Sequence, residues 1–385
     1  MNTPYTLLNV ARVVSGAGSL ECLPQIVADL GARRVLIISD KGVARAGLLE
    51  RPRVLLEAAG MTVTLIDDTP PEPDVNQVEA ILAMAKQHEQ DLVIGIGGGS
   101  AMDVAKLIAV LLSGELLLSQ LLDKTPVTRR GLPTLMVPTT AGTGSEATPN
   151  SIVLVPASQL KVGIVSAQFM PDCVILDPEL TLGLPPAITA STGMDALCHA
   201  IECFTSRKHN PFSDMLALEA IRLISRSILT AFRHGGDLAA RQDMMLGAFY
   251  GGMCIATSST TAVHALAYPL GGKYRMPHGI SNAILLPWVM RFNASGNAAA
   301  FRPVAQAMGL DVAGLDDDKA ATLMVEQLFV LNRELEIPAN LAQWKITGAD
   351  LDGLVEGATA VTRLLDNNPR SMSRDDIRAI YQQLI

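Results

Sequence analysis

The sequence predicts two domains in succession, an N-terminal α/β domain with a parallel sheet and an all-helical C-terminal domain. Three observations lead to this fold class. The chain has 385 residues, of which 49% are apolar, which suits about two domains of roughly 150 residues each. Short apolar runs alternate with amphipathic stretches in the first half of the chain. Strand signals then almost disappear from the second half.

Four short runs in the first half have the composition of buried strands. They are separated by stretches such as residues 75–90, in which Val78, Ile81, Leu82 and Ala85 recur at helical spacing. Continuous apolar strands separated by helices are typical of a parallel sheet that is covered on both faces. The expected strands are residues 34–40, 63–66, 92–96 and 134–138.

A change of character marks the expected domain boundary. Prolines punctuate residues 180–186, and such residues commonly interrupt regular structure. Beyond them, Ile221, Ile224 and Ile228 recur at steps of three and four residues, which predicts a helix. No internal repeat or low-complexity segment interrupts the pattern. The predicted domains are residues 1–183 and 184–385.

Composition excludes several classes of function. The chain has 30 basic and 38 acidic residues, a net charge of −8 and only 4% aromatic residues, which disfavours nucleic-acid binding. The first residues, MNTPYTLLNVARVV, do not resemble a signal peptide, and no apolar run approaches the length of a membrane span. Five scattered cysteines without a C-x-x-C pair predict free thiols in a reducing, cytoplasmic environment.

A glycine-rich turn follows the third expected strand. Gly97, Gly98, Gly99 and Ser100 stand before a predicted helix, where glycines let the backbone approach a ligand and the helix N-terminus attracts an anion. Ser100 and Asp103 also have the spacing of a capping box. The alternative is an ordinary tight turn between a strand and a helix. The pattern matches neither the G-x-G-x-x-G dinucleotide fingerprint nor a P-loop.

Two more polar segments follow expected strands. Residues 139–146, TTAGTGSE, come after the strand at residues 134–138, where hydroxyls and glycines suit polar ligand contacts in an open α/β sheet. An ordinary polar loop is the alternative.

Asp40 ends the first expected strand and could accept hydrogen bonds from an adenosine ribose while repelling a 2′-phosphate. Alternatively, Asp40 is the N-cap of a helix.

Three histidines and one aspartate of the second half could form a metal site. Asp195 and His199 share one face of a predicted helix because they are four residues apart. His264 lies in another helical pattern, and His278 lies in a loop or at a helix start. Three imidazoles and one carboxylate suit a divalent ion such as Fe²⁺ or Zn²⁺. An isolated pair of this spacing is more often a surface hydrogen bond.

Five motifs in chain order together resemble the iron-containing (group III) alcohol dehydrogenases. They are GGGSAMDVAK at 97–106, PTTAGTGSE at 138–146, GMDALCHAIE at 193–202, the spaced histidines within 264–279, and NNPR at 367–370. The resemblance covers nearly the whole chain. It implies a dinucleotide-binding α/β domain, a helical metal-binding domain of dehydroquinate synthase-like architecture, and a cleft between the two. It also implies the use of NAD or NADP and, often, a homodimer.

The resemblance also assigns roles to individual residues. It implies metal ligands at Asp195, His199, His264 and His278. It implies pyrophosphate contacts at Gly98, Gly99 and Ser100, within a cofactor-binding segment that includes Gly97 and Asp103. Thr139, Thr140 and Thr143 would line the cofactor, and Asn150 and Lys161 match positions that face cofactor or substrate. Asp40 matches the position that reads the adenosine ribose.

Tyr268 departs from the commoner pattern of this family. Many relatives carry a histidine four residues after the third metal ligand, and it is often assigned to proton transfer. An unperturbed tyrosine, with a pKa of about 10, is poorly matched to that role. We therefore expect Tyr268 to act in catalysis by ordering a water or a substrate hydroxyl. The alternative is that it packs against Pro269.

The resemblance implies reversible hydride transfer between a small primary alcohol, or its aldehyde, and NAD, with Fe²⁺ or alternatively Zn²⁺. One carboxylate and three neutral imidazoles leave a divalent ion with a formal charge of about +1, which favours loss of the alcohol proton. One alternative is an NAD-using lyase or cyclase of the dehydroquinate synthase type, and another is a non-catalytic nucleotide- or metal-binding protein. A cytoplasmic homodimer with small-molecule partners, and without nucleic-acid or membrane partners, is expected.

Overall fold

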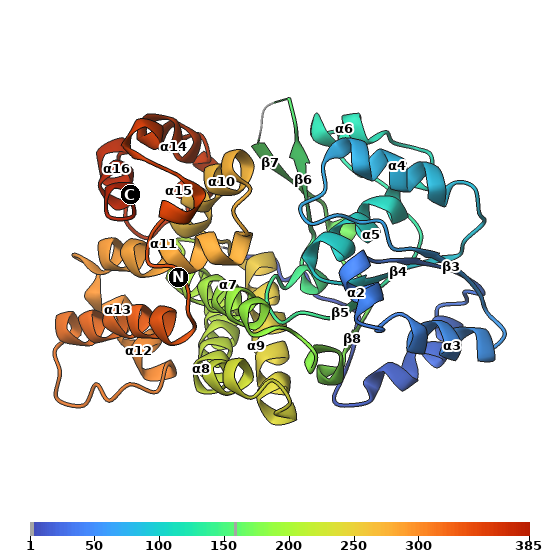
Figure 1. Cartoon of the computed structure of the whole chain (residues 1–385), viewed down its shortest axis with the longest axis horizontal. Helices are drawn as coiled ribbons and strands as arrows, with labels where there is room; N and C mark the ends of the chain where they lie inside the picture. Colours follow the sequence, from blue (N-terminus) through green and yellow to red (C-terminus); the bar gives the residue numbers. More distant parts are fainter. Residues whose placement is uncertain (1–3, 158–159) are drawn as a thin grey trace. The chain divides into compact units, whose positions relative to one another are not determined.

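The computed structural model, which describes residues 4–157 and 160–385, separates an α/β unit from a helical unit (Figure 1). The α/β unit is Leu8–Gly183, and the helical unit contains Leu184–Ile385 together with residues 4–7. The fold class predicted from the sequence, a parallel α/β domain followed by an all-helical domain, is confirmed.

Six parallel strands form the sheet of the α/β unit, in the order β1-β8-β5-β4-β2-β3. All four predicted strands are present, as β2, β3, β4 and β5. Sequence analysis did not identify β1 and β8, which are only four residues long each. The strands are β1 (Arg12–Ser15), β2 (Arg34–Ile38), β3 (Thr62–Ile66), β4 (Leu92–Gly97), β5 (Thr134–Pro138) and β8 (Cys173–Leu176).

Helices connect the strands, and an antiparallel hairpin follows β5. The predicted helix at residues 75–90 starts at Val75, as expected, but ends at Ala85 because the polar run that follows offers no apolar face. A capping box of Asp74 and Gln77, which was not predicted, stabilises its start. The hairpin pairs β6 (Asn150–Val155) with β7 (Leu160–Val165). The helices are α1 (Leu23–Asp29), α2 (Lys41–Arg45), α3 (Glu50–Ala58), α4 (Val75–Ala85), α5 (Gly99–Leu111) and α6 (Leu118–Leu122).

The strand order places a topological switch point between β2 and β4. From β2 the chain continues outward to β3, whereas from β4 it continues to β5 on the opposite side. In open α/β sheets, ligands bind outside the carboxyl ends of the strands at such a point. Asp40 follows β2 and residues 98–100 follow β4, so two of the predicted cofactor-binding segments lie at this position.

Residues 184–385, all of which the structure describes, form helices and no strand. The long helices α7, α8 and α9 pack on one another, and α11 packs against α7, α10 and α13 (Figure 1). Ile221, Ile224 and Ile228 are buried on α8, as their spacing predicted. The helices are α7 (Pro186–Thr205), α8 (Pro211–Arg233), α9 (Leu238–Thr257), α10 (Ala262–Tyr274), α11 (His278–Ala294), α12 (Arg302–Ala307), α13 (Asp317–Glu334), α14 (Leu351–Thr359), α15 (Thr362–Leu365) and α16 (Arg374–Gln382).

The NNPR motif at residues 367–370 ties the C-terminal segment to α11. Asn368 and Asn293, both buried, each donate to the other's amide oxygen at 2.7 and 3.0 Å. Arg370 donates to the carbonyl oxygen of Phe292 at 2.9 Å. The motif therefore fixes the helix whose first residue is His278.

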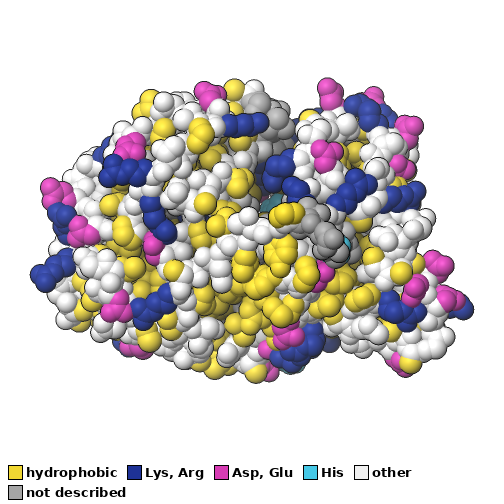
Figure 2. All heavy atoms as spheres, turned by 180° about the vertical axis from the view of Figure 1, so that it is seen from behind, with side chains coloured by type: hydrophobic (Ala, Val, Ile, Leu, Met, Phe, Trp, Pro, Cys, Tyr) yellow, Lys and Arg dark blue, Asp and Glu magenta, His cyan; other side chains and the backbone are white. Residues whose placement is uncertain are grey.

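The surface carries charges of both signs. On the face that Figure 2 shows, acidic and basic side chains are interspersed among apolar and uncharged ones. Over the described parts of the chain, none of the helices combines the length and the apolar character that crossing a membrane requires.

Candidate functional site

Four side chains from three helices converge in the helical unit. Asp195 and His199 come from α7, His264 from α10, and His278 from the first position of α11. The Nε2 atoms of the three histidines lie 3.7, 3.9 and 3.8 Å, in chain order, from the same oxygen, Oδ1 of Asp195. The structure thus brings together all four residues that the sequence analysis named as candidate ligands.

The spacing and the donor chemistry fit a divalent metal ion. Two ligands that each lie about 2.0–2.2 Å from a tetrahedral ion are about 3.4 Å apart. The observed separations of 3.7–3.9 Å between the nitrogens and the shared oxygen are slightly larger, so small side-chain shifts would close the group around an ion. These distances are too long for hydrogen bonds. Imidazole and carboxylate donors together suit Fe²⁺ or Zn²⁺.

The four candidate ligands are mostly buried, and their electrostatic environment favours binding of a cation. The side chains of Asp195, His199 and His264 are 3–5% exposed, whereas that of His278 is 27% exposed. Burial raises the pKa of Asp195, but attraction to the three histidines and a hydrogen bond from Asn282 outweigh it and hold the pKa at about 2. The carboxylate is therefore ionised at neutral pH, as a metal ligand must be.

Asn282 contacts three of the four candidate ligands and was missed by the sequence analysis. Its amide nitrogen donates to Oδ1 of Asp195 at 2.7 Å and lies 3.1 Å from Nε2 of His264 and 3.2 Å from Nε2 of His278. The residue is buried on α11. Its position four residues after His278 places it on the same helix face, a signal that could have identified it.

Glu202 contacts the same group from the other side of His264. Its Oε2 lies 2.5 Å from Nδ1 of His264, and its Oε1 accepts hydrogen bonds from Thr261 and Val263. Burial raises the pKa of Glu202, but attraction to His264 and these hydrogen bonds outweigh it and lower the pKa overall. Glu202 stands three residues after His199, so helical spacing could again have identified it.

Tyr268 lies on the helix that carries His264. It is half-buried in α10, one helical turn beyond that histidine and directly before Pro269. Residues four apart share a helix face. This position is compatible with the predicted catalytic role and with the packing role, so both remain predictions.

The predicted phosphate-binding segment forms the N-terminus of α5. Gly98 is the N-cap, and no described side chain caps this helix, so its first N–H groups can face an anion. Gly97 has a φ of 152°, and a Cβ there would lie 2.9 Å from that of Ala101. A Cβ at Gly99 would lie 2.8 Å from Thr143. Glycine therefore lets the two predicted loops approach each other closely.

The predicted threonines lie beside these glycines. The backbone N–H of Thr139 donates to the carbonyl oxygen of Gly97 at 3.0 Å, and the side chain of Thr140 is in contact range of Gly98. Thr139 is buried, whereas Thr140 and Thr143 are half-buried. The carboxyl ends of the neighbouring strands β4 and β5 thus present one continuous polar surface.

The predicted capping box of Ser100 and Asp103 is wrong. Ser100 lies inside the first turn of α5, and its hydroxyl accepts a hydrogen bond from the backbone of Glu72 at 3.2 Å. Asp103 is buried, and its two oxygens accept from Ser145 Oγ at 2.5 Å and from the backbone of Ile152 at 2.9 Å. Tertiary contacts override the local pattern, and they connect Asp103 to Ser145 of the second loop and to β6.

Lys106 completes this internal network. It is buried, and its Nζ donates to the carbonyl oxygens of Ser145, Asn150 and Thr148 at 2.6, 2.8 and 3.2 Å. Burial lowers the pKa of Lys106, and the neighbouring Asp103, 3.4 Å away, opposes that shift. One buried ammonium therefore fixes the second loop and the start of β6, where Asn150 lies.

Asp40 is the N-cap of α2, so that interpretation is confirmed. Its Oδ1 accepts from the backbone of Gly42 at 2.7 Å and of Val43 at 3.0 Å. Its other oxygen points toward Gly97, because a Cβ at that glycine would come within 3.3 Å of Oδ2. The cap therefore leaves one carboxylate oxygen beside the predicted phosphate-binding segment, where a ribose could reach it.

Lys161 lies on β7 with its side chain 8% exposed. Its Nζ pairs with the carboxylate of Glu72 at 2.6 Å, and the backbone of Glu72 is the donor to Ser100. This chain of contacts links the hairpin to the predicted phosphate-binding segment. Lys161 is thus connected to the predicted cofactor site within the same unit.

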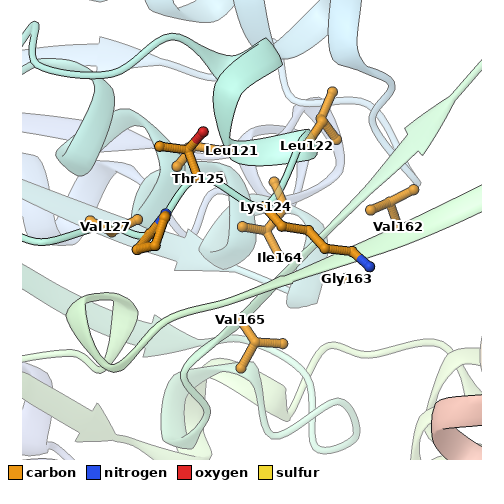
Figure 3. A pocket seen from close by; sticks show the side chains of 10 residues that line it. Leu121, Leu122, Lys124, Thr125, Val127, Val162, Gly163, Ile164 and Val165 are labelled. Atoms are coloured by element: carbon orange, nitrogen blue, oxygen red, sulfur yellow. The ribbon is translucent and has the colours of Figure 1, made fainter.

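A cavity of about 130 Å³ lies elsewhere in the α/β unit, between α6 and β7 (Figure 3). None of the residues predicted for the site lines it. Its walls are mainly aliphatic, which is typical of a packing seam. They include Leu121, Leu122, Val127, Val162, Ile164 and Val165.

Family comparisons cover both units. The model of iron-containing alcohol dehydrogenase matches residues 11–178, and that of the C-terminal region of the Fe-containing alcohol dehydrogenase family matches residues 189–385. The chain belongs to the iron-containing alcohol dehydrogenase family. The predicted family and the predicted metal-dependent, NAD-using oxidoreductase class are confirmed. The alternative reading as a lyase or as a non-catalytic binding protein is not favoured.

Individual relatives of this dehydrogenase are similar over almost their whole length. Long-chain-alcohol dehydrogenase 1 of Geobacillus thermodenitrificans is 38% identical, with 97% of each chain covered. The crystal structure of a 1,3-propanediol oxidoreductase superposes with a TM-score of 0.96 at 33% identity, covering 100% of both chains. A second similar structure is the sulfoacetaldehyde reductase from Bifidobacterium kashiwanohense, which was solved in complex with NAD⁺. It superposes with a TM-score of 0.86 at 29% identity, covering 100% of this chain and 99% of that chain.

Proposed function

We propose that this dehydrogenase transfers a hydride reversibly between a small primary alcohol, or its aldehyde, and NAD. Fe²⁺, or alternatively Zn²⁺, would be held by Asp195, His199, His264 and His278. The observation that carries the proposal is the convergence of three histidine Nε2 atoms on one oxygen of Asp195. The names of the relatives, which include a propanediol dehydrogenase and a lactaldehyde reductase, support alcohols and aldehydes as the substrate class.

The metal, when bound, supplies a Lewis acid for the substrate oxygen. Asp195 contributes the one negative charge among the four donors, so the occupied site keeps a formal charge of about +1. His278 is the most exposed of the four, at 27%. Its side of the group is therefore the one from which we propose that a small substrate enters. Tyr268, one turn after His264, would order a water or the substrate hydroxyl on the same helix face.

The cofactor would bind at the switch point of the α/β sheet. The uncapped start of α5 would hold the pyrophosphate through backbone N–H groups, because that helix end carries a partial positive charge. Asp40 would accept from the adenosine ribose and repel the 2′-phosphate of NADP, which favours NAD. The residues proposed for the cofactor site are Asp40, Gly97, Gly98, Gly99, Ser100, Asp103, Thr139, Thr140, Thr143, Asn150 and Lys161.

We extend the proposal to a homodimer that acts in the cytoplasm. The family resemblance supports the dimer. The five cysteines are free, and four of them are buried, which suits a reducing compartment. Light scattering on the purified chain, with and without cofactor, measures the oligomeric state directly.

Reconstitution of the metal-free enzyme tests the proposed reaction. The protein is stripped with a chelator, loaded with Fe²⁺ or Zn²⁺, and assayed for NADH formation with short alcohols, diols and hydroxyacids, and for NADH consumption with aldehydes. We expect turnover only in the loaded enzyme and faster with NAD than with NADP. Full turnover in the stripped enzyme, or none with any substrate in the loaded enzyme, contradicts the proposal.

A further inference from the structure

Glu202 is a buried carboxylate beside the metal cluster that the proposed reaction does not yet use. It lies on α7, one turn after His199, and its side chain is 0% exposed. Burying an ionised carboxylate is unfavourable unless hydrogen bonds and opposite charge compensate. The groups that surround Glu202 therefore indicate its role.

Both oxygens of Glu202 accept hydrogen bonds from the start of α10. Oε1 accepts from the hydroxyl of Thr261 and from the backbone N–H of Val263, each at 2.7 Å. Oε2 lies 2.5 Å from Nδ1 of His264. Since a backbone N–H can only donate, Oε1 must be an acceptor there. Only Oε2 remains for the imidazole.

The opposite side of the imidazole shows which nitrogen of His264 carries the proton. The Nδ2 atom of Asn282 lies 2.7 Å from Oδ1 of Asp195 and 3.1 Å from Nε2 of His264. The atom beside an ionised carboxylate must be a donor, so the amide nitrogen, and not its oxygen, faces both groups. Nε2 then acts as the acceptor, and the ring proton lies on Nδ1, toward Glu202.

We propose that Glu202 is the positioning residue of His264, a role that rests on the metal site proposed above. By accepting from Nδ1, Glu202 holds the ring in the tautomer whose Nε2 lone pair points toward Asp195. The negative charge of Glu202 also makes Nε2 a stronger donor to a divalent cation. Mutation of such a hydrogen-bonding partner typically lowers the affinity for the metal by about 10–100-fold.

The Glu202→Gln variant tests this role because an amide has only one oxygen. The backbone N–H of Val263 requires that oxygen, which leaves the amide NH₂ facing Nδ1 of His264. The imidazole must then accept at Nδ1 and carry its proton on Nε2, where it blocks metal binding. We expect the affinity for Zn²⁺ to fall by about 10–100-fold.

Cys198 offers a matched control. Its Sγ is buried on the same helix, 3.9 Å from Oε2 of Glu202 and 4.0 Å from Nδ1 of His264. A thiol at these distances is a weak partner, so Cys198→Ala should keep the affinity for Zn²⁺ within about threefold. A general disturbance of packing would affect both variants, whereas loss of the carboxylate affects only Glu202→Gln.

The measurements use the full chain. Zn²⁺ affinity is obtained by competition with a chromogenic chelator, and the tautomer of His264 in metal-free protein is obtained from nitrogen-15 imidazole shifts. The proton should move from Nδ1 to Nε2 in Glu202→Gln and stay on Nδ1 in Cys198→Ala. Should Glu202→Gln fail to fold, Thr261→Val removes one hydrogen bond from Glu202 and should weaken Zn²⁺ binding by about two- to fivefold.

The outcomes separate this inference from the proposed function. Weaker Zn²⁺ binding and a moved proton in Glu202→Gln, with Cys198→Ala unchanged, support the positioning role. If Glu202→Gln binds Zn²⁺ with wild-type affinity, the positioning role is wrong and the proposed function is unaffected. The same holds for Thr261→Val if Glu202→Gln does not fold. A wild-type chain that binds neither Zn²⁺ nor Fe²⁺ overturns both.

Discussion

The proposed phosphate-binding segment and the proposed metal site, formed by Asp195, His199, His264 and His278, are assembled in different ways. In the α/β unit, residues 97–100 form one continuous turn between β4 and α5, and the second loop follows the adjacent strand β5. In the helical unit, the donors lie between Asp195 and His278 on three helices. The first site depends on local backbone geometry, and the second depends on how distant helices pack.

This difference determines how each site should respond to mutation. Glycine is required at residues 97 and 99 because a Cβ at either position would make contacts that are too close. The local sequence of the turn therefore determines its geometry. The proposed metal site instead depends on neighbours from other helices, as where Asn282 holds Asp195 and Glu202 contacts His264. Changes in one unit should therefore leave the ligand of the other unit bound.

The largest effect is expected for His264→Ala. This change removes one of four donors and should reduce kcat/KM by about 1,000-fold or more, because the site loses its Lewis acid. NAD affinity should stay within about twofold, since the proposed phosphate contacts belong to the α/β unit. Steady-state kinetics and fluorescence titration with NAD measure the two effects.

His88→Ala, at an exposed histidine, is the control for the loss of an imidazole. Full activity of metal-free His264→Ala would contradict the metal mechanism. Loss of NAD binding in the same variant would show that the two sites are not independent.

Lys106→Met is the corresponding change in the α/β unit. It removes a buried ammonium that binds three carbonyl oxygens and leaves Asp103 without its charged neighbour. Breaking a buried pair of this kind costs about 3–5 kcal/mol of stability. We expect a lower unfolding temperature and NAD affinity reduced at least about tenfold, with Zn²⁺ affinity unchanged.

The exposed Lys86→Met is the control for Lys106→Met. Calorimetry and separate titrations with NAD and Zn²⁺ distinguish the two units. An equal loss of Zn²⁺ affinity would show that the sites are not independent.

The α/β half was more predictable from the sequence than the helical half. All four predicted strands formed, and continuous apolar runs such as residues 92–96 are typical of strands that are buried on both faces of a parallel sheet. The short strands β1 and β8 were missed, and so were β6 and β7 of the hairpin. The capping box failed because Asp103 finds better partners in tertiary structure, at Ser145 and Ile152.

In the helical half, periodicity predicted helices but not their packing. Spacing alone paired Asp195 with His199. Donor chemistry added His264 and His278 as a hypothesis, and the family resemblance then implied the full ligand set. Glu202 was visible within the quoted motif but had no role, since only the fold shows that it meets His264 from another helix. Local chemistry can thus be read along one helix, and contacts between helices cannot.

Glu146 should make the stability of the α/β unit depend on pH. Burial raises its pKa from 4.5 to about 7. A carboxyl group whose pKa is higher in the folded state stabilises the fold at low pH, and this contribution is lost as pH rises from about 4.5 to 7. The difference between these two pKa values corresponds to about 3 kcal/mol of folding stability.

Glu146→Gln keeps the side chain neutral at every pH. It should flatten the pH dependence of the unfolding temperature between pH 5 and 8 and stabilise the enzyme at pH 8. Zn²⁺ binding in the helical unit should not change. A variant with the same slope as the wild type would contradict the assignment to Glu146.

Asp40 should set the cofactor preference. Its charge near a 2′-phosphate is worth on the order of 1 kcal/mol or more, so the wild type should prefer NAD over NADP by about fivefold or more. Asp40→Gly should narrow or reverse this preference but also removes the N-cap of α2. Asp40→Asn retains a good cap and removes only the charge, so it isolates the electrostatic part. Equal kcat/KM for both cofactors in the wild type would contradict this role.

Tyr268→Phe sharpens the comparison within the helical unit, because it removes one hydroxyl on the helix that carries His264 and changes no proposed ligand. If Tyr268 orders a water or the substrate, kcat/KM should fall about tenfold, equivalent to about 1.4 kcal/mol of transition-state stabilisation. Zn²⁺ and NAD affinities should stay unchanged, since neither proposed site uses that hydroxyl. Tyr250→Phe, at a half-buried tyrosine of α9, is the control for the same chemical change. Unchanged kinetics across the pH range would leave packing against Pro269 as the role of Tyr268, and the proton would then leave by a route that does not involve this side chain.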